Sequence, residues 1–159
     1  MDGVMHTYTP LQAPGDPLPD ITDYRFHDAL DVADYARRNR QIGWQTWPDI
    51  WHLDDDGLMR CASRCSSLDG IRWWAEEAYF LRRTREASLE TGTCPTRWVI
   101  VESRVVFDGD VMHEGDVVAY HAVRRELAAL GVTLLDAVIF DDKCHWWSMH
   151  ELTTGTTRW

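Results

Sequence analysis

Residues 116–149 read DVVAYHAVRRELAALGVTLLDAVIFDDKCHWWSM, and this stretch decides the fold. Between Asp116 and Gly131, apolar residues recur at the spacing of one helical face, with a polar residue at the start and a glycine at the end. The apolar face consists of Tyr120, Val123, Leu127 and Leu130. An apolar run follows over 133–140, then an Asp-Asp-Lys turn and a second aromatic segment. The sequence therefore predicts a helix over 116–130 that packs on a sheet, followed by two strands.

The segments before this stretch supply the remaining elements. Residues 97–103, RWVIVES, form a nearly continuous apolar run, which is typical of a central strand covered on both faces. Residues 71–90 show the longest helical pattern, and 28–40 favour a shorter amphipathic helix. Residues 50–54 alternate in polarity before an Asp-Asp-Gly turn, and 58–64 supply the return strand of a hairpin.

The order of these elements predicts the fold class. Helices and strands alternate as α-β-β-α-β-α-β-β, which indicates an α/β (α+β) domain of three layers, with a mixed central sheet and flanking helices. The chain has 159 residues, the length of one domain. Residues 1–24 contain Pro10, Pro14, Pro17 and Pro19 and are predicted to be an extended or disordered arm, which leaves 25–159 as the domain.

Composition narrows the class of protein. The chain is 45% hydrophobic and 26% charged, as soluble globular proteins are. It has no apolar run long enough for a transmembrane helix, and its N-terminus lacks the basic and apolar regions of a secretory signal. We therefore expect no membrane association and a cytoplasmic location. The net charge of −10 counts against direct binding to nucleic acid and favours a protein partner with a basic surface.

The chain contains nine tryptophans, which is its most unusual feature. Such an excess indicates a strongly aromatic core, an exposed recognition surface, or both. Two clusters suggest an exposed surface, one beside a glycine and a proline and one on a predicted edge strand flanked by His145 and His150. The predicted binding residues are Trp44, Trp47, Trp51, Trp146 and Trp147. Aromatic residues dominate the energetics of protein interfaces, so some of these rings are expected to contact a partner.

Four stretches, taken in order, resemble the RadC-like branch of the JAB/MPN metalloprotease-fold superfamily. They are ALDVADYARR (29–38), HLDDDGLMRCASRCSSLDGI (52–71), RWVIVESRV (97–105) and the stretch 116–149. The resemblance implies a JAB/MPN-like fold over about residues 28–150. In this superfamily, metal-free members serve as scaffolds and dimerisation partners.

The same resemblance implies that the zinc site of the family is degenerate here. Active members hold zinc with a His-x-His pair and an aspartate. When Asp116 is placed at the aspartate position, Ser103 and Val105 occupy the histidine positions, and His113 occupies a serine position. Serine and valine cannot replace two imidazole ligands. The resemblance therefore implies a pseudoenzyme with no catalytic residues, no bound metal and no cofactor.

A rebuilt metal site is the alternative. Acidic residues and a histidine are dense over 102–116, and their oxygen atoms could bind a hard cation. The candidate ligands are Glu102, Asp110, His113 and Asp116. The simpler interpretation is a solvated acidic loop in which Asp116 caps its helix. The four cysteines, Cys61, Cys65, Cys94 and Cys144, form no C-x-x-C motif; they are expected to be reduced and buried, with a zinc cluster as the alternative.

These observations favour a non-catalytic protein-binding accessory factor. Analogy at the level of the fold favours a protein of a mobile genetic element that acts on a host defence or DNA-handling protein. One alternative is a remodelled metal-dependent hydrolase or nuclease that uses Asp116 and His113, and another is a factor in DNA repair or recombination. A homodimer is compatible with the sequence. The arginines at 82, 83 and 85 are interpreted as a solvated helix face that could contact an acidic partner.

Overall fold

The computed structural model describes residues 5–7, 24–38, 49–64, 70–90, 95–104, 114–141, 143 and 145–159. The strands are β1 (His6–Thr7), β2 (Asp49–Leu53), β3 (Met59–Arg64), β4 (Arg97–Arg104), β5 (Thr133–Asp141) and β6 (His145–Ser148). The helices are α1 (Ala29–Arg38), α2 (Ile71–Glu76), α3 (Ala78–Glu90), α4 (Glu114–Ala129) and α5 (Met149–Thr154). Together they confirm the predicted α/β class.

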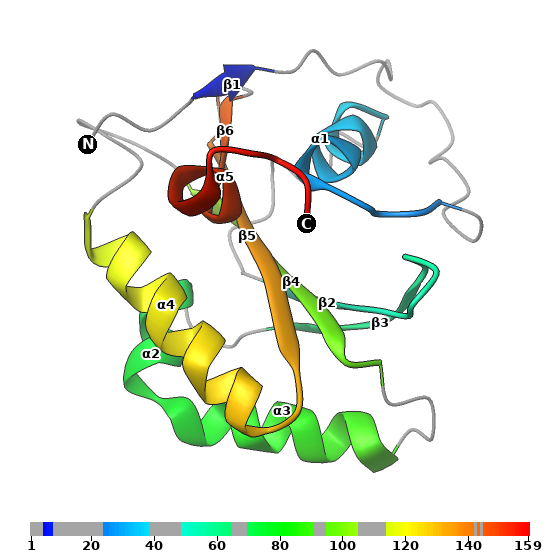
Figure 1. Cartoon of the computed structure of the whole chain (residues 1–159), viewed down its shortest axis with the longest axis vertical. Helices are drawn as coiled ribbons and strands as arrows, with labels where there is room; N and C mark the ends of the chain where they lie inside the picture. The colour runs from blue at the N-terminus through cyan, green and yellow to red at the C-terminus, as the bar shows by residue number, and fades with distance from the viewer. Residues whose placement is uncertain are drawn as a thin grey trace.

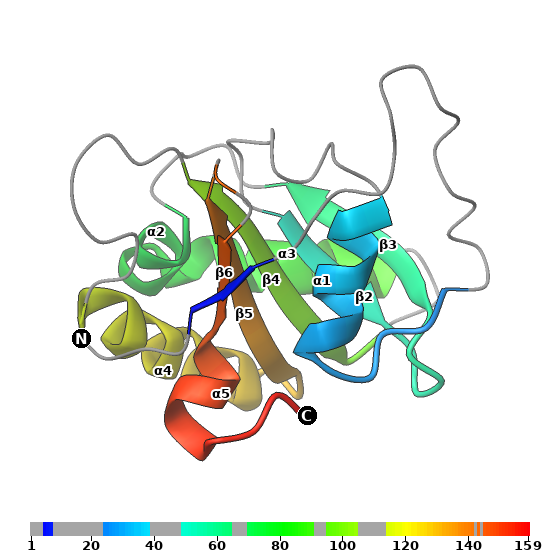
Figure 2. The same ribbon diagram turned by 90° about the horizontal axis from the view of Figure 1, so that it is seen from above.

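The strands form one mixed sheet in the order β1-β6-β5-β4-β2-β3 (Figure 1). Strands β4 and β5 are parallel, and the other neighbouring pairs are antiparallel. Helix α1 covers one face of the sheet, and α2 and α4 cover the other (Figure 2). The three predicted layers and the mixed sheet are therefore present.

The stretch that follows β4 folds as its pattern predicts. Tyr120, Val123 and Leu127 of α4 are fully buried against the sheet. After Leu127 the helix ends in a Schellman motif, in which the Val132 N–H donates to the Leu127 carbonyl oxygen at 2.9 Å. Gly131 supplies the required positive φ of 76°. Strand β4 lies between β5 and β2, so its central position is also confirmed.

Side chains of the central strands point alternately into two hydrophobic cores, one on each face of the sheet. In β4, Trp98 and Ile100 point toward α2, α3 and α4, whereas Val99 and Val101 point toward α1. This alternation follows from the two-residue period of a strand. Both faces of β4 are buried, and this explains why its sequence is apolar at successive positions.

The predicted hairpin is formed by β2 and β3 and closed by a turn over residues 54–57. The Asp54 carboxylate accepts hydrogen bonds from the backbone N–H groups of Asp56 and Leu58, at 2.9 and 3.0 Å. Gly57 takes a φ of 84°, and its N–H donates to the Asp54 carbonyl oxygen. An aspartate at the start and a glycine at the end are what such a turn requires.

The helix predicted over 71–90 is wrong in one respect, because the chain breaks at Glu77 into α2 and α3. Helix α2 packs Trp74 against α4, whereas α3 takes a different direction and runs along one end of the molecule, with Leu81 turned inward (Figure 1). Neither glycine nor proline stands at the break, so the sequence carries no local signal of it.

The end of the last strand is a second correction. The strand predicted to include His150 ends at Ser148, and His150 lies in α5. The Ser148 hydroxyl accepts a hydrogen bond from the Glu151 N–H at 3.0 Å and so caps the helix. Strand β6 is also not the edge strand that was predicted. Strand β1 pairs with it through His6 and Thr7, which lie in the segment predicted to be an arm.

Among the described residues, no helix has the length and apolar character that crossing a membrane requires.

Candidate functional site

Three of the five predicted binding tryptophans are buried inside the chain. Trp51 packs on the rings of Phe26 and Tyr35, with centroid distances of 5.0 and 5.7 Å. Trp146 lies beneath the stacked ring of His6, at 4.2 Å, and Trp147 belongs to the core on the α4 side. The prediction that these three tryptophans are exposed is therefore wrong, because their rings pack in the two hydrophobic cores. The other two residues, Trp44 and Trp47, lie outside the described residues.

An exposed aromatic surface does exist, on α2 and α3. Tyr79 and Phe80 are 53% and 41% exposed, and Trp73 is half-buried beside them. The ring centroids of Trp73 and Phe80 are 4.6 Å apart, and those of Tyr79 and Phe80 are 5.5 Å apart. The Arg82 guanidinium lies over the Tyr79 ring at 5.9 Å. We call Trp73, Tyr79 and Phe80 the aromatic patch.

The sequence contained a signal for this patch. The apolar stripe of the helix runs through Trp74, Ala78 and Leu81, so the adjacent positions 79 and 80 fall outside it. Two large aromatic side chains next to the stripe cannot both enter the core. The predicted binding residues were all tryptophans, so they do not include Tyr79 and Phe80.

Glu102 and Asp116, two of the predicted metal ligands, are buried and bound by one arginine. The Arg104 guanidinium donates to both oxygens of Asp116, at 2.8 and 2.9 Å, and its Nε donates to Glu102 at 2.7 Å. Burial alone would lower the pKa of Arg104, but the hydrogen bonds and charges of the two carboxylates outweigh burial and raise it. We call Glu102, Arg104 and Asp116 the carboxylate–arginine cluster.

This cluster changes the interpretation of both carboxylates. Asp116 is fully buried and lies within the first turn of α4, after the helix begins at Glu114, so the prediction that Asp116 caps this helix is wrong. The acidic loop before it lies outside the described residues. A guanidinium occupies the position between Asp116 and Glu102 where a cation would bind, and the half-exposed Arg72 adds a second positive charge 3.4 Å from Asp116. The other candidates, Asp110 and His113, lie outside the described residues. Within the described ranges, no three histidine, cysteine or acidic side chains are grouped to hold a metal.

The position that the resemblance gives to a zinc ligand lies on the other face of the sheet. Ser103 follows Val99 and Val101, which point toward α1, and its neighbour across the parallel ladder is Phe140 of that same core. Arg104 and its partner Asp116 are on the α4 face. Ser103 and Asp116 therefore do not converge on one site.

The backbone at the start of α2 closes over the cluster. The Ile71 N–H donates to the Glu102 carboxylate at 3.2 Å. A Cβ atom added at Gly70 would lie 2.2 Å from that carboxylate, and Gly70 has a φ of 63°. Only glycine satisfies both the close approach and this backbone conformation.

A histidine–serine pair lies beneath α3 but is poorly suited to catalysis. The His52 Nε2 atom is 2.9 Å from the Ser63 hydroxyl oxygen, as in a base–nucleophile pair. Burial, together with the charge of Arg85, lowers the pKa of His52 to about 4, so its ring is a weak base at neutral pH. Among the described residues its Nδ1 atom has no hydrogen-bond partner, so none of the described carboxylates orients the ring. Nearby on β3, burial raises the pKa of the Cys61 thiol; the other cysteines lie outside the described residues.

Another histidine, His145, lies against a carboxylate at the turn between β5 and β6. The buried Asp141 carboxylate accepts hydrogen bonds from the backbone N–H groups of Lys143 and His145, both at 2.8 Å. The His145 ring Nδ1 lies 2.8 Å from the same carboxylate. Asp141 thus organises the turn, and this structural role accounts for its burial.

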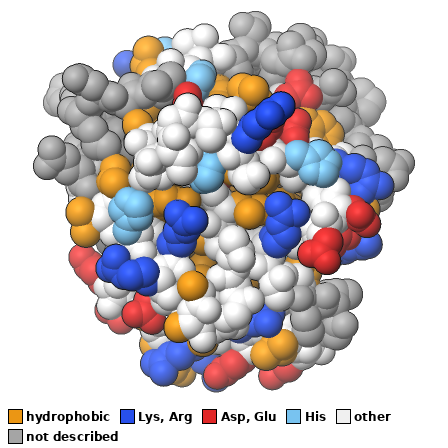
Figure 3. All heavy atoms as spheres, viewed as in Figure 1, with side chains coloured by type: hydrophobic (Ala, Val, Ile, Leu, Met, Phe, Trp, Pro, Cys, Tyr) orange, Lys and Arg blue, Asp and Glu red, His pale blue; other side chains and the backbone are white. Residues whose placement is uncertain are grey.

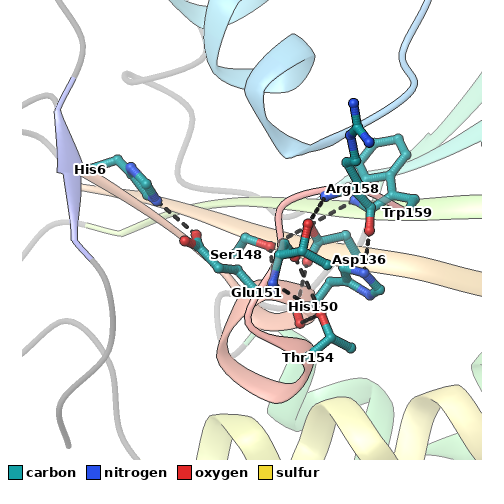
Figure 4. A network of polar contacts seen from close by, with 9 residues as sticks. His6, Asp136, Ser148, His150, Glu151, Thr154, Arg158 and Trp159 are labelled. Carbon is teal, nitrogen blue, oxygen red and sulfur yellow. Dashed lines mark hydrogen bonds and ion pairs between the residues drawn. The ribbon is translucent and has the colours of Figure 1, made fainter.

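Asp136 forms the centre of a network that anchors the C-terminal residues (Figure 4). Its carboxylate accepts from the Ser148 hydroxyl at 2.6 Å, from the Trp159 indole N–H at 2.9 Å, and from the backbone N–H groups of Ala137 and His150. Burial raises the pKa of Asp136 to about 6, although these hydrogen bonds act in the opposite direction.

Asp136 is expected to make stability depend on pH. Its pKa rises from 3.8 to about 6 on folding, so between these values the folded protein keeps a proton that the unfolded chain has lost. The stabilisation is therefore complete below about pH 4 and falls by about 3 kcal/mol as the pH rises through 6. Urea denaturation of the wild type and of Asp136→Asn over this range should give a difference that changes by this amount. A difference independent of pH would contradict the assignment.

The described clusters thus divide into two kinds. Most of the buried polar groups described above form hydrogen bonds or ion pairs with one another. The rings of Tyr79 and Phe80 in the aromatic patch are instead exposed and able to contact a partner. The patch is the best candidate for a functional site because rigid aromatic rings next to arginine are what protein interfaces select. The chain matches no family model and no curated protein.

Proposed function

We propose that this chain is a non-catalytic protein-binding factor that binds its partner through the aromatic patch. The observation that carries the proposal is the exposure of Tyr79 and Phe80, in contact with one another and with Trp73. Aromatic rings on a helix bury a large area at a small cost in side-chain entropy, and they are enriched among binding hot spots.

The electrostatic setting supports the same proposal. Arg82 stacks on Tyr79 at the edge of the patch, and arginine is also enriched at interfaces. On the sequence resemblance, we further propose a RadC-like JAB/MPN pseudoenzyme, with a role as an accessory protein of a mobile element.

The buried polar groups support a non-catalytic role. Arg104 already engages the carboxylates of Glu102 and Asp116, which hydrolysis by a rebuilt metal site would require as ligands. The lowered pKa of His52 makes its ring a weak base, poorly suited to activate Ser63 at neutral pH. These groups are better explained as parts of the folded structure than as a reaction centre.

Phe80→Ala is expected to weaken partner binding by about 2 kcal/mol or more, with little loss of stability. Affinity capture from the native host, compared between wild type and Phe80→Ala, measures the first effect, and thermal melting measures the second. Val118→Ala is the matched control, because Val118 is an exposed apolar residue on α4, outside the patch. If the wild type and both variants capture the same proteins in the same amounts, the patch is not the binding surface.

A further inference from the structure

We infer that a second copy of the chain docks on α3, with the two α3 helices antiparallel. The inference rests on the proposed function, since it names a partner for the surface that includes Tyr79 and Phe80. Helix α3 runs along one end of the molecule (Figure 1). In the space-filling view, that end shows hydrophobic, basic and acidic side chains side by side (Figure 3).

Exposed apolar side chains are concentrated on this helix. The large hydrophobic residues exposed in the described part of the chain are Met5, Leu30, Tyr79, Phe80, Leu89 and Val118, and three of these lie on α3. The opposite side of the helix is buried through Leu81 and Ser88. Helix α3 thus has one side in the core, and on its outward side Tyr79 is exposed, with Phe80 and Leu89 exposed on opposite flanks.

The outward face of α3 carries charges in a self-complementary order. Tyr79, Arg83, Glu86 and Glu90 follow one another at intervals of four, three and four residues, which places them on one stripe. The Arg83 and Glu86 side chains are 63% and 62% exposed, and they approach each other only to 3.7 Å within the helix. An exposed pair at that distance contributes little to stability, so both side chains are free to change partners.

An antiparallel arrangement of two α3 helices pairs the opposite charges of this stripe. When the two-fold axis passes between residues 84 and 85, each residue of the stripe lies opposite the stripe residue equally far beyond the axis on the second copy, and each flank meets the same flank of that copy. Arg83 then faces Glu86 of the second copy, and Glu86 faces its Arg83, so two ion pairs form. Tyr79 lies opposite Glu90 of the second copy, where its hydroxyl can donate to the carboxylate.

The flanks of the stripe cover the exposed apolar atoms. Phe80 and Ala87 lie on one flank, so Phe80 of each copy reaches Ala87 of the other. Arg82 and Leu89 lie on the other flank, where the aliphatic stem of Arg82 covers Leu89 of the second copy. A parallel pair would instead set Arg83 against Arg83 and Glu86 against Glu86, and like charges in contact are unfavourable. The antiparallel orientation is therefore selected.

The dimer is expected to be weak. Helix α3 has 13 residues and is about 20 Å long, so two such helices bury less area than a standard interface does. The expected dissociation constant is micromolar. Sedimentation velocity from low micromolar to submillimolar concentration should show the wild type passing from monomer to dimer.

Charge reversal tests the orientation and the pairing. Arg83→Glu and Glu86→Arg should each weaken dimerisation by more than about tenfold, because each sets like charges opposite each other. A mixture of these two variants restores both ion pairs and should form a heterodimer where neither variant dimerises alone. The double variant Arg83→Glu/Glu86→Arg should dimerise as the wild type does. Arg125→Glu, at an exposed position on α4, is the control for a change in net charge.

A wild type that stays monomeric over the whole range would overturn the inference, and so would a dimer that both reversals leave intact. Circular dichroism melting confirms that each variant folds, and exposed substitutions of this kind change stability little. The proposed function has a separate readout. A monomeric wild type whose captured partner is lost in Phe80→Ala would refute the dimer and leave the protein-binding role standing.

Discussion

Arg104→Met is expected to lower the free energy of unfolding by about 3–5 kcal/mol. The substitution leaves the buried carboxylates of Glu102 and Asp116 without the guanidinium that binds them. Arg72 alone cannot compensate both charges, because it reaches only Asp116, at 3.4 Å, and is half exposed. Urea denaturation monitored by tryptophan fluorescence would measure the loss.

Two control variants separate loss of charge balance from loss of packing. The triple variant Glu102→Gln/Arg104→Met/Asp116→Asn removes all three charges and should recover much of the stability. Arg60→Met removes a surface arginine that pairs with Asp54 and should cost less than about 1 kcal/mol. If the triple variant were as unstable as Arg104→Met, packing of the arginine would be the cause.

Gly70→Ala is expected to cost about 3 kcal/mol or more. The new methyl group would overlap the Glu102 carboxylate, 2.2 Å away, and the residue would have to keep a φ of 63°. Relief of the overlap requires Glu102 to move, which disturbs its hydrogen bonds to Ile71 and Arg104. Thermal and chemical denaturation would both report the change.

Gly131→Ala is the matched control for this substitution. Gly131 has a similar φ of 76°, but a Cβ atom there would meet none of the described atoms within 4 Å. Its replacement should cost only the penalty of the left-handed conformation, about 1–2 kcal/mol. The excess loss in Gly70→Ala measures the close approach to Glu102, and equal losses in the two variants would show that this contact is unimportant.

The elements predicted correctly are those whose signals are local. The stripe of α4 ends at a glycine with positive φ, the β4 run is apolar on both faces, and the β2–β3 turn carries its aspartate and glycine. Each pattern lies within one segment and has one dominant physical cause. Helix α5 also has a local signal, because the S-x-x-E sequence over 148–151 is typical of a capped helix start, although the predicted strand extended to His150.

The carboxylate–arginine cluster and the burial of the tryptophans could not be predicted in the same way. The partner of Asp116 is Arg104, and the two meet only because β4 and the start of α4 lie together in the fold. An aspartate that pairs with an arginine and an aspartate that binds a metal are the same residue type, so the sequence does not distinguish the two roles. Trp51 and Trp146 posed a similar problem, since an indole ring suits a core and an interface equally well.

The pairing of β1 with β6 has a consequence for how the protein resists aggregation. His6 lies opposite Trp146, although almost the whole chain separates them, so closing this pair is entropically costly for a strand of two residues. The short strand is therefore the part of the sheet that detaches most easily. When it detaches, the backbone of β6 and the face of Trp146 become an open edge on which a strand from another molecule can assemble. The stacking of the His6 ring on Trp146 and the 2.7 Å contact of its Nε2 atom with Glu151 thus help to keep this edge of the sheet covered.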